Sequence, residues 1–161
     1  MKILVVDDDT VFQQVMVECL RSIGHQNVSV ATSAIEALEI VQSQSVGFDC
    51  ILLDIQMPDM DGIGLCHALR SLRTYRRVPI VMVTSQSAKH YIDDAFAAGA
   101  TDYVTKPLDR LELKARIGMV ERLVDERRNV LLLTRLSDQR SDSVLADMSF
   151  DSSILVPDFD R

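Results

Sequence analysis

The stretch FDCILLDIQMPDMDG, residues 48–62, contains an apolar run, an acidic residue directly after it, Asp54, and a loop rich in turn residues. A short apolar run bounded in this way predicts a strand over residues 49–53 that is buried on both faces. Pro58 and Gly62 interrupt the chain, so we assign Gly62 to a turn before a helix. The stretch therefore predicts a strand, a polar loop and a helix.

The same unit recurs along the chain. A buried strand is indicated each time by a short apolar run, and a helix by apolar residues three and four positions apart. Ser33, with Glu36 three residues on, predicts a helix start, whereas Gly24 and Gly99 predict helix ends. The strands are expected over residues 3–6, 27–31, 49–53, 79–83 and 102–104, each followed by a helix. This alternation predicts a doubly wound α/β fold, with a five-stranded parallel sheet covered on both faces.

Polar residues follow four of these strands. They are the run Asp7-Asp8-Asp9, then Asp54, Thr84 and Lys106. Ligands of such sheets bind beyond the carboxyl ends of the strands, so these residues predict one shared site. Each also has an ordinary alternative: Asp9 or Thr10 as a helix cap, Thr84 as a solvated strand end, Lys106 as a surface charge. Their combination favours the shared site.

Composition limits the classes of function. The chain has 161 residues, 47% of them hydrophobic, a net charge of −7 and a pI near 4.9. An acidic surface argues against direct binding of nucleic acid or of an anionic membrane. Three cysteines without a CxxC pair, together with the absence of a signal sequence or a long apolar span, predict a cytoplasmic protein.

Four motifs carry a family resemblance. VVDDD (5–9), LLDIQMPDMDG (52–62), VMVTS (81–85) and DYVTKP (102–107) resemble the CheY-like receiver domain of two-component response regulators. The resemblance covers residues 1–122. It implies a flavodoxin-like fold with strand order 2-1-3-4-5, in which the first and third strands are neighbours. Their carboxylates would then lie together and require a cation.

The resemblance also implies roles for individual residues. Asp54 would accept a phosphoryl group, and Lys106 would pair with it. The implied Mg²⁺ ligands are Asp7, Asp8, Asp54 and the backbone carbonyl of Gln56, and the implied switch residues are Thr84 and Tyr103. The family's Lys106-Pro107 bond is cis, whereas Pro107 could equally start the last helix; the sequence leaves both open.

A phosphoryl acceptor of this kind is a signalling switch and not a turnover enzyme. A carboxylate attacks phosphorus only when the negative charges are neutralised, which explains the paired aspartates and Mg²⁺. The partner implied by the resemblance is a histidine kinase or a phosphotransfer protein. Phosphorylation would change the face formed by the fourth helix and fifth strand, through which family members dimerise or contact an output element.

A second family competes for the first motif. VVDDDTVF, residues 5–12, also fits the DxDxT motif of haloacid-dehalogenase-like phosphohydrolases, with Asp7 as nucleophile and Asp9 as acid/base. Thr84 and Lys106 would be the next two motifs. That family needs a further acidic pair after the lysine, with a Gly-Asp pattern, and no Gly-Asp follows Lys106. Asp54 would also have no role, so the receiver is favoured.

The carboxyl-terminal part is expected to leave the domain. Apolar positions at Leu113, Ile117, Val120, Val124 and Leu131 predict that the last helix runs on. Residues 123–136 are a helical extension and a candidate coiled-coil linker, through which two copies could dimerise. Residues 137–161 are rich in Ser and Asp and predict a linker or disordered tail. An output domain, if present, would lie beyond Arg161.

Overall fold

The computed structural model describes residues 1–85 and 89–148, with side chains described over 1–85 and 90–136. Strands and helices alternate through the described residues. They are β1 (Ile3–Val6), α1 (Thr10–Ser22), β2 (Val28–Ala31), α2 (Ala34–Ser43), β3 (Cys50–Asp54), α3 (Gly62–Ser71), β4 (Ile80–Thr84), α4 (Lys89–Ala97), β5 (Asp102–Thr105) and α5 (Arg110–Met148).

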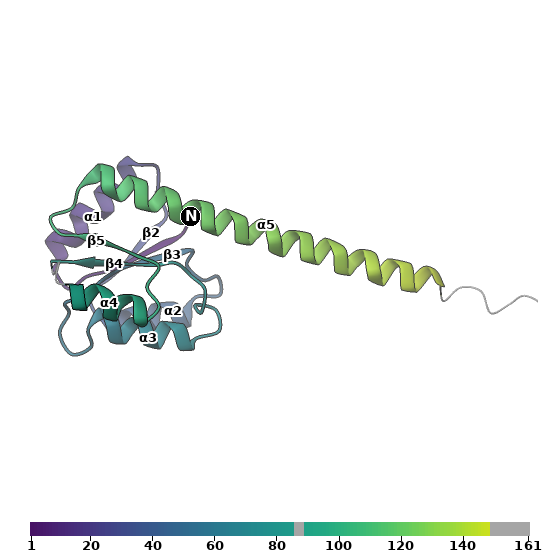
Figure 1. Ribbon diagram of the computed structural model, residues 1–161, viewed down its shortest axis with the longest axis horizontal. Coiled ribbons are helices and arrows are strands. Elements are labelled where there is room, and N and C mark those ends of the chain that lie inside the picture. Colours follow the sequence, from purple (N-terminus) through teal and green to yellow (C-terminus); the bar gives the residue numbers. More distant parts are fainter. Residues whose placement is uncertain (86–88, 149–161) are drawn as a thin grey trace, which may run out of the picture. The chain divides into compact units, whose positions relative to one another are not determined.

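The strands form one parallel sheet in the order β2-β1-β3-β4-β5, which confirms the predicted fold. Helices α1 and α5 cover one face, and α2, α3 and α4 cover the other (Figure 1). Strands β1 and β3 are neighbours, with Val6 opposite Leu53. On the other side of β3, Asp54 lies opposite Val83 of β4. The chain therefore places the ends of β1, β3 and β4 at one edge.

Each face of the sheet has its own hydrophobic core, because successive side chains of a strand point to opposite faces. Leu4, Val6, Ile51 and Leu53 pack under α2, α3 and α4, and Ile3, Val5, Cys50 and Leu52 pack under α1 and α5. All of them are at most 2% exposed. Strands buried on both faces explain the apolar runs in the sequence.

Two helix starts are fixed by polar side chains close to the site edge. Oγ of Ser33 accepts from the backbone N–H of Glu36 (3.1 Å), and the Glu36 carboxylate accepts from the backbone N–H of Thr32 (2.6 Å). The predicted cap at Ser33 is thus confirmed. Asp9 caps α1, its Oδ1 accepting from Val11 (2.9 Å) and Phe12 (3.1 Å). Asp9 was one of the two candidates for this cap.

The chain divides into two compact units, the first of which is Met1–Val124; the second begins at Asp125. Helix α5 starts in the first unit and continues to Met148, so residues 137–148, where the composition predicts a linker or tail, are helical. In the second unit the side chains of Val130, Leu131, Leu132, Leu133 and Leu136 are each more than half exposed. Residues 149–161 of the expected tail lie outside the described residues. Among the described helices, none is both long and apolar enough to cross a membrane.

Candidate functional site

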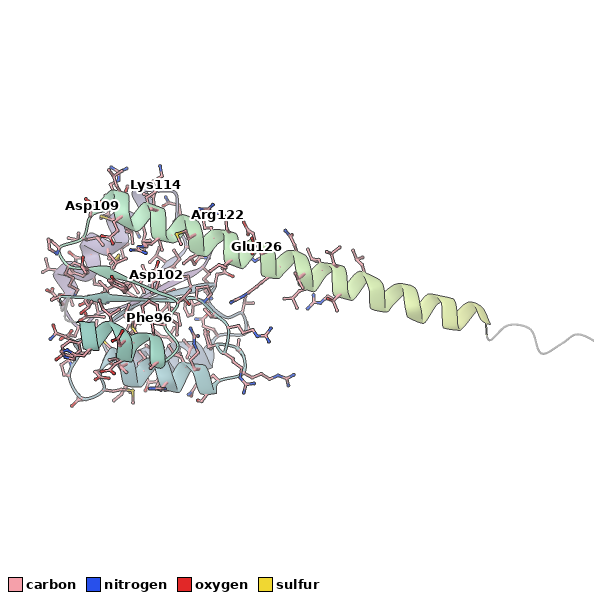
Figure 2. All side chains as sticks on the ribbon, viewed as in Figure 1. Phe96, Asp102, Asp109, Lys114, Arg122 and Glu126 are labelled. Carbon is pink, nitrogen blue, oxygen red and sulfur yellow. The ribbon has the colours of Figure 1, made fainter. Side chains whose placement is uncertain are left out.

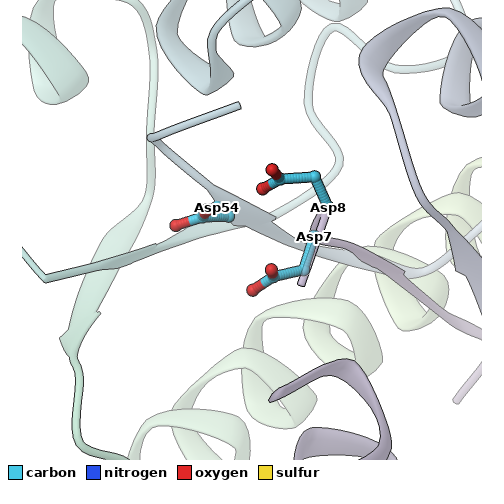
Figure 3. Close-up of side chains that lie close together, drawn as sticks. All are labelled: Asp7, Asp8 and Asp54. Carbon is cyan, nitrogen blue, oxygen red and sulfur yellow. The ribbon is translucent and has the colours of Figure 1, made fainter. Parts of the chain in front are cut away.

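Three carboxylates meet at the carboxyl edge of the sheet. Asp7 and Asp8 follow β1, and Asp54 is the last residue of β3. The parallel pairing of β1 with β3 brings them together: one oxygen from each lies within 4.8 Å of the others (Figure 3). Asp7 and Asp54 are only 2% and 4% exposed, whereas Asp8 is exposed to solvent. The cluster therefore consists of two buried carboxylates and one, that of Asp8, that is open to solvent.

Lys106, which follows β5, completes this arrangement. Its ammonium group lies 2.9 Å from Oδ2 of Asp7 and 3.3 Å from Oδ1 of Asp54. The side chain is 17% exposed. The Lys106-Pro107 peptide bond is cis, which decides between the two alternatives that the sequence left open. The Lys106 ammonium and the Asp54 carboxylate are thus in direct contact.

Burial and charge set the proton affinities in the site. Burial of the Asp54 carboxyl raises its pKa to about 6; Lys106 opposes this increase and the charge of Asp7 adds to it. Burial by itself would lower the pKa of Lys106, but its hydrogen bond to Asp7 and the charge of Asp54 raise that pKa above its usual value. Lys106 is therefore a cation at neutral pH and Asp54 is mostly ionised.

The ligand set fits a divalent cation. With all three carboxylates ionised and Lys106 protonated, the site carries two uncompensated negative charges. Mg²⁺ prefers carboxylate and carbonyl oxygens and retains water ligands. An exposed Asp8 beside two buried carboxylates provides oxygen ligands together with access for water. The chemistry of the site thus matches this cation in charge and in ligand type.

Asp9, the cap of α1, and Gln13, within that helix, hold Asp7 in place. The backbone N–H of Asp9 donates to Oδ1 of Asp7 (2.9 Å). Gln13 is buried, and its amide donates to the backbone carbonyls of Asp7 (3.3 Å) and Ala31 (2.9 Å). The sequence reasoning missed Gln13. The sequence feature that could have indicated its burial is its helical spacing from Met16 and Leu20, with which it forms the buried side of α1.

Gly62 has a different role from the predicted turn. It is the first residue of α3, and its backbone N–H donates to the carbonyl of Ile55 (2.9 Å). A Cβ at this position would collide with the backbone carbonyl of Asp54. Glycine is required here because the helix start presses against the backbone of Asp54, and not because of a special backbone angle.

The remaining predicted residues lie after β3, on β4 and on β5. The backbone N–H of Gln56 contacts the Asp54 carboxylate and favours its ionised form. Thr84 is the last residue of β4 and is fully buried, so it is not a solvated strand end. Tyr103 lies on β5, 6.2 Å from Phe96 of α4 between ring centroids and 5.8 Å from the Arg116 guanidinium carbon of α5. Figure 2 labels its neighbours Phe96 and Asp102, which lie on α4 and β5.

Comparison with known proteins identifies the family. The sequence model described as the response regulator receiver domain matches residues 3–118. The chain belongs to the response regulator receiver family. It is thus a receiver domain of two-component signalling, a family of phosphoacceptor domains, and the phosphohydrolase alternative is not favoured. Asp9, which that alternative needs as a free acid/base, instead caps α1.

Curated relatives carry receivers in different settings. The receiver is 35% identical over 120 residues to the chemotaxis protein CheY of Pseudomonas aeruginosa, which covers 74% of this chain and 95% of that protein. It is 38% identical to the transcriptional regulatory protein YvrH of Bacillus subtilis over 71% of this chain, but this spans only 46% of YvrH. It is 35% identical to the hybrid signal transduction histidine kinase L of Dictyostelium discoideum over 70% of this chain, which spans only 7% of that kinase.

Solved structures share the fold. The chemotaxis protein CheY4 of Vibrio cholerae superposes with a TM-score of 0.68 at 31% identity, over 74% of this chain and 97% of that one. The receiver domain of the sensor histidine kinase PA1611 of Pseudomonas aeruginosa superposes with a TM-score of 0.66 at 31% identity, over 77% of this chain and 97% of that one. That second structure has a magnesium ion coordinated in its active-site cleft.

Proposed function

We propose that this receiver accepts a phosphoryl group on Asp54 in a Mg²⁺-dependent reaction, with a histidine kinase or a phosphotransfer protein as the donor. The observation that carries the proposal is the contact between Asp54, which is 4% exposed, and the Lys106 ammonium at 3.3 Å, beside the carboxylates of Asp7 and Asp8. A nucleophile, a cation and two further carboxylates thus share one edge of the sheet.

In the transfer, a carboxylate oxygen of Asp54 forms a bond to phosphorus while the bond between phosphorus and the donor nitrogen breaks. The electron pair of the broken bond stays on the donor. Lys106 leaves its contact with Asp54 to pair with the transferred phosphoryl oxygens, and its bond to Asp7 keeps it at the site. No proton has to leave Asp54, because its carboxyl is mostly ionised at neutral pH.

Asp7, Asp8, Asp54 and the backbone carbonyl of Gln56 would hold the Mg²⁺. When bound, this ion neutralises the charge that otherwise repels the phosphoryl group from the carboxylates. Asp8 supports this assignment because it is the exposed member of the cluster and so faces incoming solvent and donor. Gln13 and the Asp9 backbone fix Asp7, which keeps the ligand positions preformed.

The charge on Asp54 would act at a distance through Thr84 and Tyr103. Thr84 ends the strand next to β3, so its hydroxyl can move toward the phosphoryl group, and Tyr103 can turn into the space it leaves. The face of α4 and β5 would then change and contact a second copy or an output element. Dimerisation through α5 is the other route, supported by the exposed apolar residues from Val130 to Leu136.

Labelling with a small phosphodonor tests the proposal. Acetyl phosphate with Mg²⁺ should add one phosphoryl group, labile in strong acid and in base, to the native protein, detected as a mass shift. Asp54→Asn should abolish the shift, because an amide is not a nucleophile toward phosphorus, and chelation of Mg²⁺ should suppress it. Asp49→Asn is the matched control, since Asp49 directly precedes the same strand at its opposite end. Continued labelling of Asp54→Asn would refute the assignment.

A further inference from the structure

Lys106 has a third neighbour that no phosphoryl chemistry requires. Its ammonium nitrogen lies 4.1 Å from the centroid of the Phe12 ring. The same nitrogen contacts Asp7 at 2.9 Å and Asp54 at 3.3 Å. The cation therefore lies between two carboxylates and the face of an aromatic ring, which is a more defined environment than the carboxylates alone would give.

The ring itself is held in place. The backbone N–H of Phe12 donates to the Asp9 side chain (3.1 Å) in the cap of α1. Its side chain is half-buried and packs against the core cluster between α1, α5 and the sheet. The contact with Lys106 is thus between a fixed ring and the end of a flexible side chain. The ring therefore restricts where the ammonium can lie, in addition to the bond that Lys106 makes to Asp7.

The position of this ammonium affects how well it can stabilise the transferring phosphoryl group. A lysine has four rotatable bonds, and one that is free to turn toward solvent is displaced from the transferring phosphoryl group for part of the time. The attraction between an aromatic face and a cation changes an equilibrium by roughly 2- to 5-fold at exposed sites and by about 30-fold when water is excluded. The ring leaves the N–H donors of the ammonium available to the phosphoryl oxygens, because a ring face accepts no conventional hydrogen bond.

We infer that Phe12 is a positioning residue for phosphoryl transfer: its ring holds the Lys106 ammonium beside Asp54 and shields that side from water. The inference rests on the proposed role of Asp54 and Lys106 and adds a residue from α1 to it. Phe12 is also part of the hydrophobic packing on this face of the sheet. Its contact with a cation of the site gives it a second role.

Substitutions can separate the ring face from the apolar bulk. Phe12→Leu keeps an apolar side chain and removes the ring, and Phe12→Met does the same with a different shape. Phe12→Tyr keeps the ring. The chain provides a matched control in Phe48, which also lies under a lysine, with Lys2 Nζ 4.7 Å from its ring centroid. Lys2 precedes β1 and Phe48 precedes β3, so this second pair is at the amino edge of the sheet, opposite the site.

The experiment measures the rate constant of phosphorylation by acetyl phosphate at fixed Mg²⁺, with unfolding by urea to establish that each variant is folded. We expect the rate constants of Phe12→Leu and Phe12→Met to be about 3- to 10-fold lower than that of the native protein, because loss of a cation–aromatic contact has an effect of this size. Phe12→Tyr should stay within about twofold. Phe48→Leu should also stay within about twofold, although it loses stability.

Three results would overturn the inference: native rates in both Phe12→Leu and Phe12→Met, equal slowing in Phe12→Tyr, or equal slowing in Phe48→Leu. If one apolar variant does not fold, the other decides. Failure of the proposed function gives a different result, because labelling would then persist in Asp54→Asn whatever happens at Phe12. The two conclusions can therefore be rejected separately.

Discussion

The Asp54 carboxylate is mostly ionised at neutral pH although it is buried. Burial raises the pKa of its carboxyl to about 6, while Lys106 and the Gln56 backbone N–H favour the ionised form. The residue is therefore ionised at neutral pH, but only by a margin of about one pH unit. A modest change in pH or in local charge should be measurable as a change in cation binding.

Cation binding should depend on pH in one direction only. Below about pH 6, Asp54 is protonated in the cation-free protein, so Mg²⁺ must displace one proton from it. Above about pH 6, Asp54 is ionised and Mg²⁺ binding displaces no proton from it. We expect the dissociation constant for Mg²⁺, measured by calorimetry, to rise about tenfold for each unit of pH below 6 and to level off above 7. Asp54→Asn should bind more weakly and lose this dependence. A flat profile in the native protein would contradict the role of Asp54 as a ligand.

Some residues of the site could be predicted from sequence because parallel strands bring their carboxyl ends to one edge. Asp7, Asp8, Asp54 and Lys106 are such residues. Gln13 and Phe12 could not be found in this way. Gln13 is a polar residue among the buried positions of α1. Phe12 is apolar, and periodicity does not distinguish a side chain packed against hydrocarbon from one packed against an ammonium group.

The start of α3 packs closely against the backbone of the site. Gly62 leaves no room for a Cβ against the Asp54 carbonyl, whereas a Cβ at Gly118 within α5 meets nothing within 4 Å. The two glycines therefore make a matched pair. Both lie in helices of the first unit, and only one touches the site.

Gly62→Ala should destabilise the protein by about 1–3 kcal/mol, because α3 or the Asp54 backbone must shift. Gly118→Ala should stabilise it by about 0.5–1 kcal/mol, since alanine is the better helix residue. Urea unfolding of both variants measures these changes. Phosphorylation should be slower in Gly62→Ala alone. A neutral Gly62→Ala would show that the junction adapts without cost.

Most strands could be predicted to within one or two residues, since runs buried on both faces have little freedom to shift. The fourth strand was expected over 79–83 and is found at Ile80–Thr84. Pro79 lacks an N–H for the ladder, and Thr84, despite its polarity, is fully buried within the strand. The length of α5 was harder to predict. The Ser- and Asp-rich composition after residue 136 argued against helix, but extending an existing helix needs no new nucleation.

The first unit, Met1–Val124, is expected to fold and to accept a phosphoryl group without the remainder of α5. The core that includes Val124 ends where the second unit begins. A chain of residues 1–128 should fold and be phosphorylated at a rate within about twofold of that of the full chain, because every residue proposed for the site lies in the first unit. Loss of folding in the shorter chain would contradict this division.

The same comparison tests self-association. Five large apolar side chains between Val130 and Leu136 are more than half exposed, a density unusual for a helix that stays in water. Sedimentation velocity should show dimers of the full chain and monomers of residues 1–128. Replacing Leu131 and Leu132 with Glu in the full chain should also give monomers. A monomeric full chain, with and without phosphoryl label, would exclude dimerisation through α5.

The bond between Asp7 and Lys106 joins residues 99 positions apart in the chain. Contacts over such long separations form late in folding, because the intervening chain must first be ordered. Asp7 and Asp8 leave the ribosome early, but their cationic partner is nearly a full domain behind them. A chain still being synthesised therefore has acidic residues without the lysine that completes the site. Under the proposed mechanism, a receiver needs β5 in the sheet before it can accept a phosphoryl group, so unfinished chains would not compete for it.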